Sequence, residues 1–392
     1  MSQTLVPVHA SLVGWSEGDI GIIGSAYFFG FVIGCLTVPK LLTRVGHIRV
    51  FLTLSGITSA SILMLRDMQD VSIWIGLRLL AGWCLAAIYT TAESWINENA
   101  ENAQRGRLIS IYVLVSLGGM ASGQILFGLI ELEYLFSAAA MLILASLVPV
   151  GLFCRDQPML LEKKNIRMRS VRKVPLRARG CMFFSGLVTG SIWTMTPLII
   201  ESSQLDIALS GLIMMTVIIG GAAFQLPVGT ASDRFERLTV TKILVFSCLA
   251  ISVVGFFAQF DHIFHLALIM FLLGGTSLSL YTLASAEAND LTELTPVEIA
   301  SVLLFMNGLG SAFGPPLTGL VMSWTYSGLF LVSGGGMVSL LVLLYVDRLS
   351  LFKPEITKGE ESDSADVINI ENYLGEEEIL LREGPEQKEL TG

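Results

Sequence analysis

Charged residues are scarce in this chain: Asp, Glu, Lys and Arg form 15% of its 392 residues, against 53% for the hydrophobic set. A soluble globule could not bury so much apolar surface, so the composition predicts a protein whose solvent is lipid. The sequence holds no GxxxxGK[ST] phosphate loop, no selectivity filter and no metal or nucleophile cluster. These absences argue against an ATP-driven machine, a channel and an enzyme, and we expect no cofactor.

Cysteine is also sparse, and the five residues show neither Cys-x-x-Cys nor Cys/His spacing. We therefore expect buried free thiols and no metal site. The formal charge of -9 comes mainly from the stretch 348–392, which has 12 acidic and 5 basic residues. This acidic tail is predicted to be disordered, with a short amphipathic segment at 368–381.

Apolar runs fill most of the remaining sequence. A helix needs about 20 apolar residues to cross the hydrocarbon core, and eleven runs meet that length. They are 20–43, 48–65, 71–95, 107–130, 134–154, 179–201, 207–231, 238–258, 263–286, 298–322 and 326–346. A shorter apolar stub at 5–13 precedes them.

Basic residues are distributed unequally between the two sets of loops. One side has 17 Lys and Arg residues, nine of them between Arg155 and Arg179, and the other side has only Arg66. Because basic loops are retained in the cytoplasm, the first side and the C-terminus are predicted to be cytoplasmic. The stretch 155–178 is interpreted as a basic linker between halves rather than as a nucleic-acid site, and anionic lipid could hold it.

Two parts of the sequence repeat each other. Arg44 and Arg234 occupy matching loops 190 residues apart, and glycines 119, 123 and 128 match glycines 310, 314 and 319 at an offset of 191. The repeat predicts two six-helix halves. The same offset puts the start of the first helix before Met1, which indicates a wrongly assigned start codon, with an artificial truncation or a true eleven-span protein as alternatives.

The loop with Gly229, Asp233, Arg234 and Arg237 resembles the signature of the major facilitator superfamily, and the resemblance extends over essentially the whole chain. The first-half copy keeps Arg44, Gly46 and Arg49 but has Pro39 and Thr43 at the usual glycine and aspartate positions. Arg78 and Gly82 resemble a second motif of the family. The stretches 25–31, 44–49, 93–97 and 118–124 are similar to its bacterial YcaD-type branch.

Three charged residues are candidates for transport or proton coupling: Arg78, which lies well inside a predicted span, and Glu93 and Glu287, which lie near the cytoplasmic ends of the fourth and tenth helices. Charge inside a membrane usually faces a partner or an aqueous cavity. A structural hydrogen-bonding role for Arg78, and contact of both glutamates with interfacial water, are the alternatives. The resemblance also implies that the first, fourth, seventh and tenth helices line a cavity, with His9, Tyr89, Trp193, Thr194 and Tyr281 as candidates. Packing, lipid contact or, for His9, simple solvation would explain them equally.

A cytoplasmic latch is expected from the signature loops. The Asp233 carboxylate could accept hydrogen bonds from a neighbouring helix N-terminus and pair with Arg105 or Arg107, and a purely topogenic role is the alternative. The candidate latch residues are Arg44, Gly46, Arg105, Arg107, Gly229, Asp233, Arg234 and Arg237. Glycines 30 and 34 and the rows around Gly123 and Gly314 are interpreted as close helix-packing sites.

Together these patterns predict an all-α polytopic membrane protein of the major facilitator fold, with 12 helices of which the first is incomplete. Its expected parts are 1–154, the linker 155–178, 179–347 and the tail 348–392. The resemblance implies a secondary transporter of a small solute that works by alternating access, and Glu93 and Glu287 make protons the expected coupling ion. It is expected to be monomeric and to lie in a bacterial inner membrane. We do not expect it to bind nucleic acid. A non-transporting sensor or scaffold whose tail binds a partner is the alternative.

Overall fold

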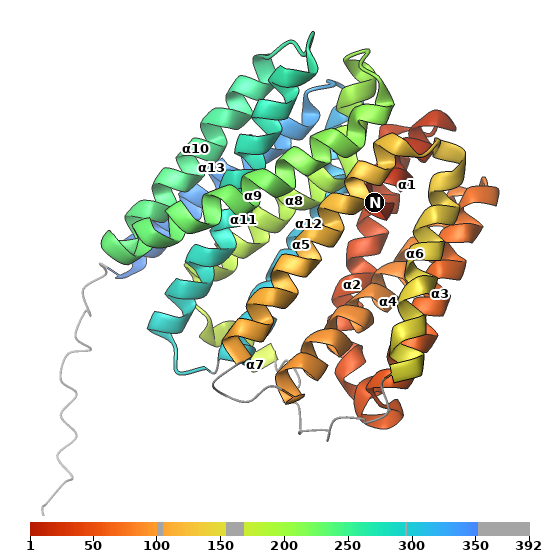
Figure 1. Ribbon diagram of the computed structural model, residues 1–392. Coiled ribbons are helices and arrows are strands. Elements are labelled where there is room, and N and C mark those ends of the chain that lie inside the picture. Colours follow the sequence, from red (N-terminus) through yellow and green to blue (C-terminus); the bar gives the residue numbers. More distant parts are fainter. Residues whose placement is uncertain (100–104, 154–167, 295, 352–392) are drawn as a thin grey trace, which may run out of the picture. The chain divides into compact units, whose positions relative to one another are not determined.

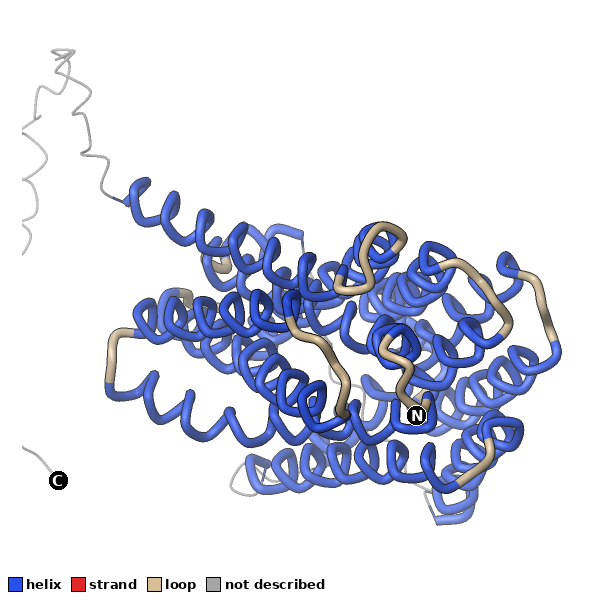
Figure 2. The backbone as a smooth tube through the Cα atoms, turned by 90° about the horizontal axis from the view of Figure 1, so that it is seen from above, coloured by secondary structure: helices blue, strands red, loops and turns tan. Residues whose placement is uncertain are grey.

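The computed structural model describes residues 1–99, 105–153, 168–294 and 296–351, and this part of the chain is almost entirely helical (Figures 1 and 2). Residues 1–347 form one compact unit. The helices are α1 (Ser2–Leu12), α2 (Glu17–Val45), α3 (His47–Asp67), α4 (Val71–Asn99), α5 (Arg105–Leu129), α6 (Leu132–Phe153), α7 (Met168–Lys173), α8 (Leu176–Ser202), the 3-10 turn η1 (Ile207–Leu209), α9 (Ser210–Arg234), α10 (Arg237–Phe257), α11 (Ile263–Leu291), α12 (Pro296–Met322) and α13 (Gly328–Leu351).

The predicted spans are found as helices α2 to α6 and α8 to α13. Ten of the described helices are long and apolar enough to cross a membrane. The remaining one, α5, has 25 residues, and its apolar part within the described residues is 114–129. The stub predicted at 5–13 lies on α1, which has 11 residues. Most of the predicted linker and nearly all of the tail lie outside the described residues.

Helix ends follow local chemistry. The Ser16 hydroxyl accepts a hydrogen bond from the Asp19 amide at the start of α2, and the Asp70 carboxylate accepts from the amides of Ser72 and Ile73 at the start of α4. These side chains satisfy amides that lack a partner within the helix. Between α2 and α3 the backbone turns at Gly46 with φ +91°, a conformation that favours glycine.

Close helix pairs rely on glycine. A Cβ at Gly30 would collide with the Leu79 carbonyl, and one at Gly82 with the Tyr27 carbonyl, so α2 and α4 touch along their backbones. Gly220 and Gly274 join α9 to α11 in the same way, and Gly310 and Gly314 join α12 to α8. The repeat is thus visible in the packing, and close contacts at Gly30, Gly34 and Gly314 are as expected.

The row around Gly123 behaves differently from its counterpart in α12. Gly119 and Gly128 have nothing within 4 Å of an added Cβ, and Gly123 approaches only Met1. The expectation of close packing along this row was therefore wrong for the described residues. The physical reason is that the chain approaches Gly123 only with Met1, the residue before α1, whereas in α12 the backbone of α8 meets Gly310 and Gly314 and that of α2 meets Gly319.

The helix bundle has two ends. The basic end carries the loops near residues 46, 235–236 and 292–294, and the opposite end carries the turns at 13–16, 68–70, 203–206 and 323–327. Towards the opposite end, the N-terminal half (α1–α6) packs tightly on the C-terminal half (α8–α13). An added Cβ at Gly21 would lie 2.6 Å from the Pro315 carbonyl oxygen, and one at Gly319 would collide with the Glu17 carbonyl.

A proline creates a hydrogen bond across this seam between α2 and α12. Pro316 has no amide hydrogen, so the Ala312 carbonyl loses its helical donor. The Ser25 hydroxyl of α2 donates to that carbonyl at 2.5 Å, and both residues are buried. Nearby, the Ser11 hydroxyl of α1 bonds the Glu201 carboxylate of α8. These contacts hold the two halves together at the opposite end.

Candidate functional site

A cavity of about 320 Å³ lies between the two halves. Most of its wall comes from α8, α9, α11 and α12, and α2 and α5 close it from the other half. The polar residues around it are Ser185, Thr189, Trp193, Gln225, Tyr281, Asn307 and Ser311. The apolar ones are Phe28, Leu117, Met120, Met182, Ile218, Gly221, Ala222 and Leu278.

Two of the five predicted lining residues, Trp193 and Tyr281, lie on this wall. Thr194 is 1% exposed and packs against Gly24 in the contact between α8 and α2. Tyr89 is exposed but is not part of the wall. His9 lies elsewhere, in a second pocket at the opposite end with Arg66 and Glu133, where its ring contacts Trp74 and Phe136.

Arg78 of α4 is 2% exposed and joins three helices. Its guanidinium carbon lies 4.6 Å from the ring centroid of Tyr27 on α2, and Nη2 donates to the Gln3 side-chain oxygen on α1. Within the described residues no carboxylate pairs with it, and its buried Nε has no hydrogen-bond partner. Arg78 is therefore a buried charge held by an aromatic face and an amide.

Glu93, further along α4, is exposed and stands near a group of tyrosines. Its carboxylate interacts electrostatically with Tyr89, with Tyr112 of α5 and with Tyr281 of α11. Tyr281 also lines the cavity. Glu93 is thus the predicted carboxylate whose charge acts on tyrosines of both halves, one of which lines the cavity.

Glu287 of α11 has a different environment. It is 7% exposed, and its Oε1 lies 3.4 Å from Arg177 Nε. The same nitrogen lies 2.7 Å from Asp347 Oδ2, so one arginine of α8 connects carboxylates of α11 and α13. This arrangement is a largely buried ion-pair network at the basic end.

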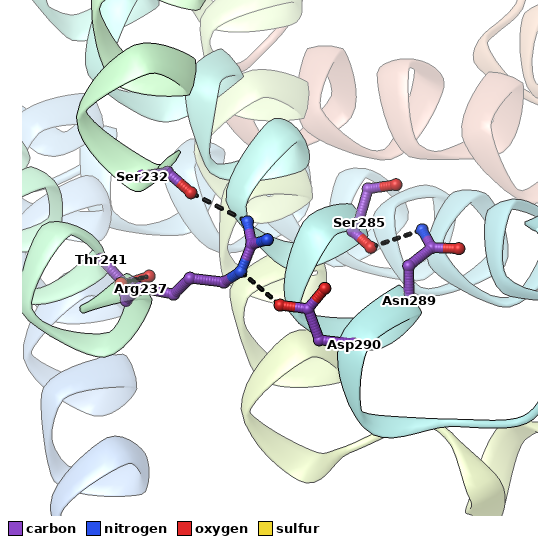
Figure 3. A network of polar contacts seen from close by, with 6 residues as sticks. All are labelled: Ser232, Arg237, Thr241, Ser285, Asn289 and Asp290. Atoms are coloured by element: carbon purple, nitrogen blue, oxygen red, sulfur yellow. Dashed lines mark hydrogen bonds and ion pairs between the residues drawn. The ribbon is translucent and has the colours of Figure 1, made fainter. Parts of the chain in front are cut away.

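Arg237 begins α10 and forms a second network, shown in Figure 3. Its Nε lies 2.6 Å from Asp290 Oδ2 of α11, and its Nη1 donates to the Ser232 hydroxyl of α9 at 3.0 Å. The motif arginine therefore fixes the ends of three helices in the C-terminal half. Figure 3 also shows the Asn289 amide, which bonds the Ser285 carbonyl within α11.

Most of the other latch candidates in the described residues lie at exposed positions, and Gly46 is buried in the turn between α2 and α3. Asp233 and Arg234 are exposed at the end of α9 and make no hydrogen bond or ion pair within the described residues, and Arg44 is exposed at the end of α2. Gly229 has nothing within 4 Å of an added Cβ. The side chains of Arg105 and Arg107 lie outside the described residues.

Several residues of these sites were not predicted. Three of them are charged residues near helix ends: Asp290, Arg177 and Asp347. The sequence does not show which opposite charge each of them meets. Gln225 and Asn307 are polar residues inside apolar spans, and that position is a signal that could have identified them.

The all-helical architecture and the central cavity define a polytopic membrane transporter of the major facilitator fold. The family model of the Major Facilitator Superfamily matches residues 1–295 and 178–374. The chain therefore belongs to this superfamily and is a multi-pass membrane transporter, not an enzyme.

Relatives and solved structures agree with this assignment. The uncharacterized MFS-type transporter YcaD of Salmonella arizonae is 30% identical over 354 residues, which cover 87% of this chain and 90% of that protein. YcaD of Escherichia fergusonii is 28% identical with the same coverage. A mutant of the nucleoside transporter NupG has a TM-score of 0.71 at 15% identity, covering 90% of this chain and 95% of that one.

A further solved structure is a bacterial homolog of the human lysosomal transporter Spinster in an inward-facing and occupied conformation. It has a TM-score of 0.69 at 12% identity, and the match covers 88% of this chain and 91% of that one. At these identities the two structures support the fold alone.

Proposed function

We propose that this protein is a secondary active transporter that moves a small solute by alternating access and uses protons as the coupling ion. The observation that carries the proposal is the cavity between two halves whose seam is tight towards the opposite end. Rocking the halves about this cavity would expose it to each side of the membrane in turn.

The contacts between α2 and α12 support a state closed at the opposite end. Their close approaches run from Gly319 and Glu17 through Gly21 and end, towards the basic end, at Gly308 and Val32. The basic end is the cytoplasmic one in this proposal, so the structure corresponds to an inward-facing state in a bacterial inner membrane. The protein acts as a monomer.

Glu93 is the better of the two coupling candidates. Its charge acts on Tyr112 of the N-terminal half and on Tyr281 of the cavity wall, so its protonation can depend on how the two halves are arranged. Glu287 already has an arginine partner and is mostly buried, which favours a structural role at the basic end.

The exposed Asp233 carboxylate serves the latch in the other state. When the basic end closes, it would meet amides or an arginine of the N-terminal half, with Arg105 and Arg107 at the start of α5 as the proposed partners. Arg237 supports this loop from within its own half through Asp290.

A substrate screen in a deletion strain tests the proposal. Uptake and efflux of labelled solutes are compared between cells with the wild-type gene, an empty vector and Glu93→Gln. A solute whose gradient depends on the gene, and collapses with a protonophore, would support the proposal. Flux that is insensitive to the protonophore would contradict proton coupling. A variant lacking residues 355–392 should retain flux, and its loss would favour a role of the tail in partner binding.

A further inference from the structure

None of the described residues that line the cavity between the halves is charged. The buried charges of the described bundle are committed elsewhere: Arg78 lies between α1, α2 and α4, and Glu287 pairs with Arg177. An ion that leaves water for such a wall loses hydration and gains no opposite charge in contact. The wall therefore discriminates against ionised solutes.

Three side chains on the wall offer hydrogen-bonding groups that no protein atom uses. The Trp193 indole N–H, the Gln225 amide and the Tyr281 hydroxyl have no hydrogen-bond partner within the described residues, and they come from α8, α9 and α11. They are not among the atoms cut off from the cavity by burial. A solute in the cavity can thus meet both donors and an amide acceptor.

The serine and threonine hydroxyls of the same wall already donate their protons to backbone carbonyls. Ser185 donates to the Ser277 carbonyl at 2.7 Å, Thr189 to the Ser185 carbonyl at 2.9 Å, and Ser311 to the Gly186 carbonyl at 3.1 Å. These bonds use the hydroxyl protons to hold the helices together, so the three oxygens can only accept from a solute. The Asn307 amide donates to the Met182 carbonyl at 3.4 Å and keeps its side-chain oxygen as an acceptor. The polar groups of the wall without any partner among the described residues are therefore those of Trp193, Gln225 and Tyr281.

The rest of the wall is apolar and adaptable. Phe28, Leu117 and Met120 line the cavity from the N-terminal half, and Trp193 adds an indole ring from the C-terminal half. Methionine and aromatic side chains suit a planar hydrocarbon body, because they make extensive contacts without requiring one fixed shape. The volume of about 320 Å³ is at the small end of ligand pockets.

We infer that the cavity binds an uncharged, largely apolar or aromatic solute carrying an amide-like or hydroxyl group, with Gln225 as the principal hydrogen-bonding residue. The inference rests on the proposed function in one respect, because it takes this cavity to be the site where the solute binds. It specifies the substrate class of a site whose solute is otherwise open.

Three isosteric probes that differ in charge test it: 2-naphthamide, 2-naphthoate and 2-naphthylmethylammonium. Each is titrated calorimetrically at pH 7 into the purified full chain in detergent, with detergent alone as the blank. We expect the amide to bind at least tenfold more tightly than either ion. Gln225→Leu should weaken the amide about fivefold to tenfold, because the lost hydrogen bonds are not replaced. Leu226→Ala, at a neighbouring exposed position, should leave binding unchanged.

Ala222→Trp provides a second test, since its bulk would fill the cavity and abolish amide binding in a monodisperse protein. The inference is overturned if the naphthoate binds best, if the ammonium binds best as at a cation site near Glu93, or if the amide shows no binding above the blank. It is also overturned if Gln225→Leu and Ala222→Trp bind the amide as tightly as the wild type does. Binding at equilibrium needs no gradient, so a failure of coupled transport leaves this result intact.

Discussion

Two arginines inside the bundle, the buried Arg78 and the partly buried Arg177, should respond differently to the same substitution. Arg78→Met removes a charge that has no carboxylate partner within the described residues, whereas Arg177→Met removes the cation between Glu287 and Asp347. We expect the first variant to stay folded but inactive and the second to lose stability. The comparison separates a functional arginine from a structural one.

The magnitudes follow from the contacts. At Arg78, methionine loses a charged hydrogen bond to Gln3 worth about 1.5–3 kcal/mol and a cation–π contact worth about 2 kcal/mol. Removing the ion also removes a desolvation penalty of several kcal/mol, so the net change should be within about 1 kcal/mol. At Arg177, two mostly buried carboxylates lose their cation, which should destabilise the protein by about 3 kcal/mol.

Thermal unfolding of the purified proteins in detergent, followed with a thiol-reactive dye, suits this comparison because Cys84, Cys181 and Cys248 are buried. At about 2 °C per kcal/mol, Arg177→Met should lower the apparent Tm by about 6 °C, and Arg78→Met by about 2 °C or less. If Arg78→Met lowers the Tm as much as Arg177→Met, its role is to hold the bundle together. Full transport by a stable Arg78→Met protein would equally refute a functional role.

Three further variants test packing, coupling and the latch. Gly310→Ala places a Cβ against the Phe183 carbonyl and should cost about 1–3 kcal/mol in the same unfolding assay, while Gly335→Ala, with nothing within 4 Å, should be neutral. Glu93→Gln should abolish proton-driven accumulation in vesicles but retain solute exchange, and unchanged accumulation would exclude it as the coupling site. Asp233→Ala should increase labelling of engineered cysteines that face the basic end, and unaltered labelling would contradict the latch.

The transmembrane architecture could be predicted because lipid requires one simple property, a sufficiently long apolar helix. Spans such as 263–286, found within α11, follow from that length alone. Glycines such as Gly30 identified close helix contacts, because a missing side chain is useful where backbones meet. Gly314 is such a position, because an added Cβ would collide with the Leu187 carbonyl of α8.

The site was less predictable because a membrane helix is apolar on all sides, so periodicity does not indicate which face points inward. Trp193 lies on the cavity wall, yet its neighbour Thr194 is buried against Gly24. Gln225 was missed for the same reason. The Arg237–Asp290 pair joins residues on different helices, and nothing local in the sequence indicates that they meet.

Paired distance measurements test alternating access most directly. In a protein without native cysteines, spin labels are placed at Met68 and Tyr326 for the opposite end, and at Val45 and Phe235 for the basic end, all of them exposed positions. The account predicts two populated distances for each pair, with the opposite end widening as the basic end narrows when pH or 2-naphthamide is varied. A single unchanged distance at both ends under every condition would contradict it.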